Sequence, residues 1–488
     1  MSKFVSNVFT IFSATLLGQI IGAVASPVLS RLYSPADFGI YQLVFSIVHL
    51  IAIIACLSYN GAINLPKQDE DAASIVILCL YLIIATACIS AVILFIFSLS
   101  IESVLNAPGM SSYLFLVPFA VVASSVAAVF ASWLSRRQQF GTLAQANLSS
   151  SVTGKTASIG LGLFSPSPFG LIFGPIVNDA TLIAVSLRKI PADFSLFREV
   201  TFTKIREMAI RYKKFPQFSS LSALTSVAAT QSVALMLAVS FSPVVVGLYA
   251  MTHLIITLPL KLMGNSLASV FYQKACAEKN RTGMIDHVVK SVHSRLVSIG
   301  IFIFLILMII GPELFGFILG DQWITAGVYA QILAPWFFVV FISTPIGSIF
   351  NVFEKQGASL GFNIVLLFSR IIAILIGGFF GDPIICMVLL SVSGVACWTW
   401  MNMYLLRMGG VPIRGAMNEI VRYVVLGLIV VLPVIIAKFL SLTTFLIFCT
   451  AIVTSAVYYL IIVHQDPQLK EGMIQFLRKI IPKKSGRS

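Results

Sequence analysis

Five ionisable side chains stand in or beside long apolar segments, where a charge is costly. Lys155, Lys261 and Arg370 lie inside such segments, Asp179 lies inside another, and Arg31 ends the first. A charged side chain at the centre of a bilayer costs about 2.5–3.5 kcal/mol by insertion scales, so each position needs a physical reason. Basic groups in such places are suited to binding an anion, and a carboxylate is suited to coupling with a proton or a sodium ion.

The segments that must position these side chains are predicted to be membrane-spanning helices. Of the 488 residues, 58% are hydrophobic and only 10% are charged, which is too apolar for a soluble core. Each apolar run has about 18–28 residues, enough at about 1.5 Å per residue to cross a bilayer core of ~30 Å. The runs cover residues 8–30, 38–60, 74–98, 113–134, 143–164, 168–187, 216–240, 244–272, 295–319, 325–350, 358–380, 383–406, 423–440 and 443–463. We therefore expect an all-α polytopic membrane protein with about 14 transmembrane helices.

The charges between the runs predict an orientation. The formal net charge is +14, and 27 of the 32 basic residues fall on one side if the runs alternate across the membrane. The other side keeps only Arg31 and Lys438. By the positive-inside rule both termini are predicted to be cytoplasmic, and the basic residues are not expected to bind nucleic acid.

A weak internal repeat relates the two halves of the chain. SPADFGIY (34–41), between the first two runs, matches SPVVVGLY (242–249), between the seventh and eighth, at Ser, Pro, Gly and Tyr. Asn147 and Asn363 match at nearly the same separation. Spans 1–6 are therefore predicted to be duplicated in spans 7–12 as a parallel repeat about an axis along the membrane normal.

The repeat gives Lys155 and Arg370 corresponding places, eight and seven positions after their Asn. We expect them to face each other across a central cationic cavity that receives an anionic headgroup, with Lys261 and Arg31 as further substrate-binding candidates. Other interpretations remain open for these charges: snorkelling to an interface, or an ion pair between Lys155 and Asp179 in place of an ion-coupling role for Asp179.

The sequence divides into five predicted regions. Segment 188–215 has eight basic residues and an apolar stripe at helical spacing, which fits either an interfacial helix on anionic lipid or a cytoplasmic linker. The regions are the N-lobe with spans 1–6 (1–187), the basic amphipathic cytoplasmic linker (188–215), the C-lobe with spans 7–12 (216–406), spans 13–14 (407–464) and a basic cytoplasmic tail (465–488).

No catalytic, metal or nucleotide site is predicted. The seven cysteines include no C-x-x-C and no Cys/His ligand spacing. SSSVTGKT (149–156) resembles the end of a P-loop but lacks its first glycine and any preceding strand. The stretches between the runs are too short for a soluble catalytic domain of typical size. We therefore expect a transporter rather than an enzyme, without a cofactor, and a proton or sodium gradient is the candidate energy source.

Three motifs resemble the polysaccharide-transport branch of the MOP flippase superfamily, which includes Wzx-type O-antigen flippases. They are RLYSPADFGIY (31–41), FGLIFGPIV (169–177) and GDQWITAGVYAQILAPWF (320–337). The resemblance implies two six-helix lobes around a cationic cavity, plus two C-terminal helices. It also implies a location in the bacterial inner membrane and a role in O-antigen lipopolysaccharide or other surface polysaccharide biosynthesis.

By the same resemblance, the substrate is an undecaprenyl-pyrophosphate-linked oligosaccharide, and basic residues in the lobes bind its pyrophosphate. That role would fall to Lys155 and Arg370, and less directly to Lys261. Other membrane proteins of polysaccharide assembly are candidate partners. Two alternatives stay open: a multidrug or cation antiporter of the same superfamily, and a membrane glycosyltransferase or polymerase of polysaccharide assembly.

Overall fold

A computed structural model describes residues 3–188, 194–353 and 355–465, and the regular structure within these ranges is entirely helical. The predicted tail 465–488 lies, apart from its first residue, outside the described residues. The all-helical membrane fold expected from the sequence is confirmed.

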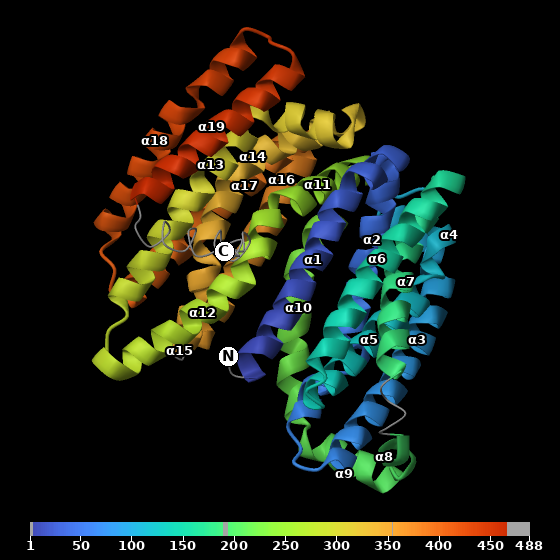
Figure 1. Ribbon diagram of the computed structural model, residues 1–488. Helices are drawn as coiled ribbons and strands as arrows, with labels where there is room; N and C mark the ends of the chain where they lie inside the picture. Colours follow the sequence, from blue (N-terminus) through green and yellow to red (C-terminus); the bar gives the residue numbers. More distant parts are fainter. Residues whose placement is uncertain (1–2, 189–193, 354, 466–488) are drawn as a thin grey trace, which may run out of the picture.

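The first half of the chain runs through seven α-helices that form one bundle (Figure 1). They are α1 (Lys3–Leu32), α2 (Pro35–Ala55), α3 (Asp69–Val104), α4 (Ser111–Leu114), α5 (Val117–Arg136), α6 (Phe140–Phe164) and α7 (Pro168–Leu187), with a 3₁₀ turn at Tyr59–Asn64.

The second half begins with the short helices of the linker and continues into the other bundle. Its helices are α8 (Phe194–Arg198), α9 (Phe202–Arg211), α10 (Ser220–Ser240), α11 (Pro243–Ile256), α12 (Leu258–Thr282), α13 (Asp286–Leu319), α14 (Ile324–Ser343), α15 (Ile349–Val352), α16 (Gln356–Phe380), α17 (Pro383–Met408), α18 (Ile413–Phe439) and α19 (Thr444–Gln465).

Twelve helical stretches of the described chain are long and apolar enough to cross a bilayer. The other two predicted spans, 143–164 and 244–272, also fall on helices, but of a different kind. The first is α6, which is long enough but rich in Ser, Thr, Asn and Gln. The second is divided at Thr257 into α11 and α12, because Pro259 cannot donate to the carbonyl of Ile255 and its ring would clash there. The count of fourteen crossings therefore stays a prediction.

The repeated motifs begin two equivalent helices. Ser34 caps α2: its Oγ accepts a hydrogen bond from the Asp37 backbone N–H at 3.2 Å, and Asp37 Oδ2 accepts one from the Ser34 N–H at 2.8 Å. Pro35 follows at the first helical position, where its missing N–H is not needed. Ser242 and Pro243 begin α11 in the same way, although without the side-chain cap.

The two equivalent helices cross at matched glycines. A Cβ added to Gly39 would overlap the carbonyl oxygen of Pro243, and one added to Gly247 would overlap that of Pro35. Only a residue without a side chain allows this approach of backbone to backbone. The reciprocal contact is what a duplicated motif related by a two-fold axis predicts.

Around this crossing the two bundles meet at one end of the molecule, which we call the contact end. There the last turn of α1 binds the α13–α14 connection: Ser30 Oγ donates to the Leu319 carbonyl at 2.8 Å, and Trp323 Nε1 donates to the Ser30 carbonyl at 2.8 Å. Asn106 Nδ2 donates to the Phe241 carbonyl at 2.5 Å. The contact end is at the top of Figure 1, and the bundles diverge below it.

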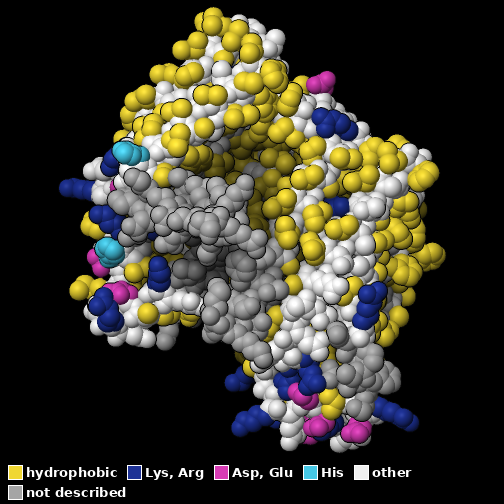
Figure 2. All heavy atoms as spheres, viewed as in Figure 1, with side chains coloured by type: hydrophobic (Ala, Val, Ile, Leu, Met, Phe, Trp, Pro, Cys, Tyr) yellow, Lys and Arg dark blue, Asp and Glu magenta, His cyan; other side chains and the backbone are white. Residues whose placement is uncertain are grey.

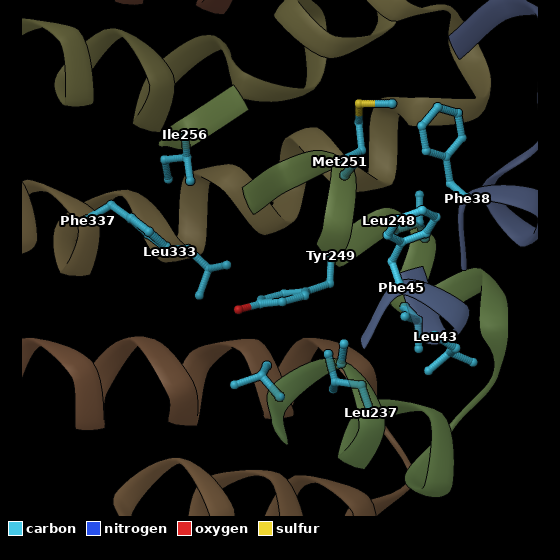
Figure 3. Close-up of a cluster of buried hydrophobic side chains, with 14 of the residues drawn as sticks. Phe38, Leu43, Phe45, Leu237, Leu248, Tyr249, Met251, Ile256, Leu333 and Phe337 are labelled. Atoms are coloured by element: carbon cyan, nitrogen blue, oxygen red, sulfur yellow. The ribbon is translucent and has the colours of Figure 1, made fainter. Parts of the chain in front are cut away.

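A hydrophobic core runs through this contact. Figure 3 shows Phe38, Leu43 and Phe45 of α2 beside residues of α10, α11 and α14. The labelled partners are Leu237, Leu248, Tyr249, Met251, Ile256, Leu333 and Phe337. Burial of these side chains holds the two bundles together at the contact end.

The opposite end, which we call the basic end, carries α8 and α9 at the bottom of Figure 1. Ile205 and Met208 are buried on one face of α9, and Lys204 Nζ lies 3.6 Å from Asp71 Oδ1 of α3. Phe202 and Ile210 remain exposed. The linker therefore contains an amphipathic helix that packs against the first bundle.

Candidate functional site

A cavity of ≈ 220 Å³ lies between the two bundles, just below the contact end. Its walls come from α1, α2, α6 and α7 on one side and from α11 and α12 on the other. The lining residues are Ser26, Leu29, Phe38, Tyr41, Gln42, Lys155, Ser158, Leu171, Pro175, Ala250, Met251, His253, Leu254 and Lys261. Figure 2, viewed as in Figure 1, shows a hollow between the bundles with hydrophobic side chains on its walls.

Each bundle contributes one lysine to this cavity. Lys155 comes from α6 and Lys261 from α12, and their charges repel each other. Neither ammonium group has a hydrogen-bond or ion-pair partner among the residues that the structure describes. None of the lining residues in the described chain is acidic. Two unpaired cations in a partly apolar cavity favour the binding of an anion, because desolvated charges require compensation.

Close packing of α6 on α7 fixes the position of Lys155. Beside it, a Cβ at Gly154 would lie 2.7 Å from Asn178 Cβ and 2.9 Å from the Gly174 carbonyl oxygen. The helices can approach this closely only because both positions are glycine. With this flank of α6 against α7, the adjacent Lys155 reaches the cavity.

The break between α11 and α12 fixes the position of Lys261. Thr257 Oγ1 donates to the His253 carbonyl at 2.6 Å, which satisfies a carbonyl at the end of α11. Helix α12 then begins afresh at Leu258, with Pro259 in its first turn. His253, which also lines the cavity, packs its ring against Tyr249 and Phe337 at centroid distances of 5.9 and 5.6 Å.

Arg370 occupies a different place from the one expected. It does not line the cavity: its Nη1 donates to the Ala229 carbonyl at 3.0 Å, and its guanidinium lies 5.2 Å from the centroid of the Trp336 ring. Its Nε is buried without a partner in the described chain. The structure thus brings Lys155 together with Lys261, and places Arg370 among α10, α14 and α16.

The remaining two sequence candidates lie outside the cavity lining. Arg31 donates to the Pro27 and Phe317 carbonyls, both at 3.1 Å, and so belongs to the contact end. Asp179 on α7 interacts electrostatically with Tyr41. The ion pair between Lys155 and Asp179 that the sequence left open does not occur among the described contacts.

Five polar lining residues were not singled out from the sequence: Ser26, Tyr41, Gln42, Ser158 and His253. A signal was present, since Tyr41 belongs to the repeated motif and His253 lies in an apolar run. Neither fact shows which side of its helix faces the other bundle. That requires the packing of α2 against α11.

Comparison with solved structures identifies the fold. The chain is similar to a lipid II flippase MurJ in an inward closed conformation, with a TM-score of 0.72 and 14% identity over 93% of this chain and 99% of that one. An inward-facing multidrug resistance MATE family transporter of the MOP superfamily matches with a TM-score of 0.58 and 14% identity, over 80% of this chain and 95% of that one. A MOP superfamily transporter from Pyrococcus furiosus matches with a TM-score of 0.51 and 14% identity, over 82% and 96%.

These likenesses show the MOP transporter fold that the motifs predicted, and at this identity they show the fold alone. No curated protein matches the chain in sequence. A family model described as "polysaccharide biosynthesis protein" matches residues 28–327, which is more than half of the chain and includes α2, α6, α7 and α11. The chain is a multi-pass membrane protein that belongs to the polysaccharide biosynthesis protein family.

Proposed function

We propose that the protein is a flippase that moves a polyprenyl-pyrophosphate-linked oligosaccharide across the bacterial inner membrane by alternating access. The observation that carries the proposal is that two lysines without an ion-pair partner among the described residues, Lys155 and Lys261, line one cavity, each from a different bundle. No acidic residue of the described chain lines that cavity. Membership of a polysaccharide biosynthesis family and the fold of a lipid II flippase support it.

The cavity lysines suit a pyrophosphate. An ammonium about 4 Å from a phosphate charge gains roughly 4 kcal/mol at an effective dielectric near 20. A pyrophosphate between Lys155 and Lys261 would also remove the repulsion between them. Because the two lysines belong to different bundles, the bound anion would favour a conformation in which both bundles engage it. Such differential binding is how a ligand shifts a conformational equilibrium.

The charge distribution gives the direction of loading. If the basic end is cytoplasmic, the contact end faces the periplasm, and the closed contact there makes this conformation accessible from the cytoplasm. The pyrophosphate would enter from the basic end and meet the lysines below the crossing of α2 and α11. Separation of that crossing would then release it on the other side.

The alternatives are less well supported. A multidrug or cation antiporter, which the MATE-like fold keeps open, needs acidic residues in its cavity to bind a cation, whereas the two charged lining residues are lysines. A glycosyltransferase or polymerase needs catalytic groups on sizeable loops, whereas the connections at the contact end are short turns between helices.

The test uses the full-length protein in proteoliposomes with undecaprenyl-pyrophosphate-linked N-acetylglucosamine as the transported probe. We expect Lys155→Ala and Lys261→Ala each to lower the initial transport rate at least tenfold, and Lys155→Arg to retain a substantial part of it because the charge remains. The matched control is Lys290→Ala, at an exposed lysine of the basic end.

Both alanine variants should insert and purify as well as the control, since removing an intramembrane charge does not impair insertion. Normal transport by both alanine variants would contradict the role of the lysines. Transport of a cationic drug in place of the lipid-linked sugar would favour the antiporter.

A further inference from the structure

A second cavity, of ≈ 440 Å³, lies between α2, α5 and α10, further from the contact end. Most of its polar lining consists of hydroxyl and amide groups. The lining residues are His49, Ala52, Ile53, Cys56, Ser58, Asn60, Ser124, Ser125, Ala128, Ser226, Val227, Thr230 and Gln231. We call it the hydroxyl-lined cavity. No Lys, Arg, Asp or Glu of the described chain is among its lining residues.

A chain of polar side chains on α2 and α10 connects this cavity with the one that holds the two lysines. Gln42, which lines the lysine cavity, lies 3.4 Å from Ser46 Oγ through its Nε2. Ser46 Oγ lies 3.1 Å from Gln231 Oε1, and Gln231 Nε2 lies 3.0 Å from His49 Nδ1. The last two residues line the hydroxyl-lined cavity. Along α2, the distance from Gln42 to His49 is about 10 Å, since a helix rises 1.5 Å per residue.

The lining of the hydroxyl-lined cavity includes a hydrogen-bonding group that has no partner in the described chain. Ser125 is only 4% exposed, and its Oγ has no partner in the described chain. A buried hydroxyl without a partner is costly unless a ligand or water satisfies it. The ring of His49 is exposed toward the same space, and Asn60 contributes an amide. Hydroxyls, amides and one imidazole face suit a ligand that carries many hydroxyl or acetamido groups.

We propose that the hydroxyl-lined cavity binds uncharged sugar residues, which follow the pyrophosphate of the same substrate molecule. The proposal rests on the proposed function, because the lysine cavity must hold the pyrophosphate. The sugars would extend from Lys155 and Lys261 along α2 toward the basic end. An acidic sugar fits poorly, since no lysine or arginine of the described chain lines the cavity to pair with its carboxylate, and burying a carboxylate unpaired is costly.

The test separates recognition of the sugar from recognition of the pyrophosphate. The purified full-length protein is titrated with three probes: undecaprenyl pyrophosphate, undecaprenyl-pyrophosphate-linked N-acetylglucosamine, and undecaprenyl-pyrophosphate-linked glucuronic acid. We expect the N-acetylglucosamine probe to bind at least tenfold more tightly than undecaprenyl pyrophosphate, and the glucuronic acid probe to show no such gain.

Two variants address the cavity. Gln231→Ala should lower the affinity for the N-acetylglucosamine probe about fivefold, which corresponds to the loss of one neutral hydrogen bond. Ser226→Leu, which fills the cavity, should reduce its affinity to that of undecaprenyl pyrophosphate. Affinity for undecaprenyl pyrophosphate itself should stay within twofold of the unmodified protein. Ser222→Leu, at an exposed position of the same helix that does not line the cavity, is the matched control.

Each outcome has one meaning. Equal binding of the sugar-bearing and sugar-free probes, or equal weakening of both by Ser226→Leu, would overturn the sugar site while leaving the lysine site intact. Failure of all three probes to bind, or their indifference to Lys155→Ala, would instead count against the proposed function. A preference for the glucuronic acid probe would contradict the assignment to uncharged sugars.

Discussion

Asp179 on α7 does not line the lysine cavity but interacts electrostatically with Tyr41, which does. Its carboxylate makes no ion pair with Lys155 in the described contacts. A carboxylate close to the substrate site, and not committed to a structural partner, is suited to exchanging a proton or a sodium ion. Of the two roles that the sequence allowed, we therefore favour ion coupling.

Asp179→Asn tests this role with an almost isosteric change. We expect normal protein abundance, because no ion pair is broken, and a transport rate that no longer rises when a gradient is imposed. The measurement is lipid-probe transport in proteoliposomes with a proton gradient, with a sodium gradient, and with neither. A variant that keeps the full response to the gradient would exclude Asp179 as the coupling group. A large loss of abundance would point to a structural role instead.

Among the helices, we expect the crossing of α2 and α11 to hold the contact end closed. Gly39→Ala or Gly247→Ala would push a methyl group into the opposite backbone carbonyl, so the closed contact should weaken by roughly 1–3 kcal/mol, the usual cost of overpacking. Gly22→Ala is the control, since a Cβ there meets nothing within 4 Å.

The readout is a cysteine at Ser30, which is fully buried at the contact end. In a background with the native cysteines replaced by serine, Ser30→Cys should react slowly with a membrane-impermeant maleimide. Gly39→Ala and Gly247→Ala should each accelerate labelling tenfold or more, and Gly22→Ala should not. Unchanged labelling in both glycine variants would mean that the crossing does not hold the contact end closed.

The same helices show what a sequence can and cannot reveal. Hydropathy located the long helices, and the repeated Ser-Pro-x-x-x-Gly motif marked the two helices that cross. The pairing of Lys155 with Arg370 was a weaker inference, because position along a helix gives depth but not rotation about the helix axis. Arg370 packs on Trp336. Lys261 reaches the cavity because the chain breaks at Thr257, a local event that the continuous apolar run 244–272 concealed.

For the molecule as a whole, we assign the contact end and the basic end to the two membrane faces. The connections near residues 105, 240 and 322 gather at the contact end, as the bonds Asn106–Phe241 and Gln322–Ser30 show. A reporter enzyme that is active only outside the cytoplasm should therefore be active when fused after residues 105, 240, 322 or 441. The same reporter should be inactive at the C-terminus, where a reporter that is active only in the cytoplasm should work. Fusions after residues 138 and 284 are the inside controls. A C-terminal reporter that is active outside would refute this topology.

The reciprocal glycine contact also limits how the two halves of the chain can diverge. After a duplication, each copy is free to change except where the copies touch. At the crossing, a bulkier residue in one copy requires the other copy's first turn to withdraw, so the two turns must stay alike in shape. The residues that do not meet the opposite backbone escape this constraint. The pair SPADFGIY and SPVVVGLY has this pattern, with Ser, Pro, Gly and the final Tyr shared and Ala-Asp-Phe replaced by three valines. The backbone of each copy therefore restricts which residues the other copy can carry at the crossing.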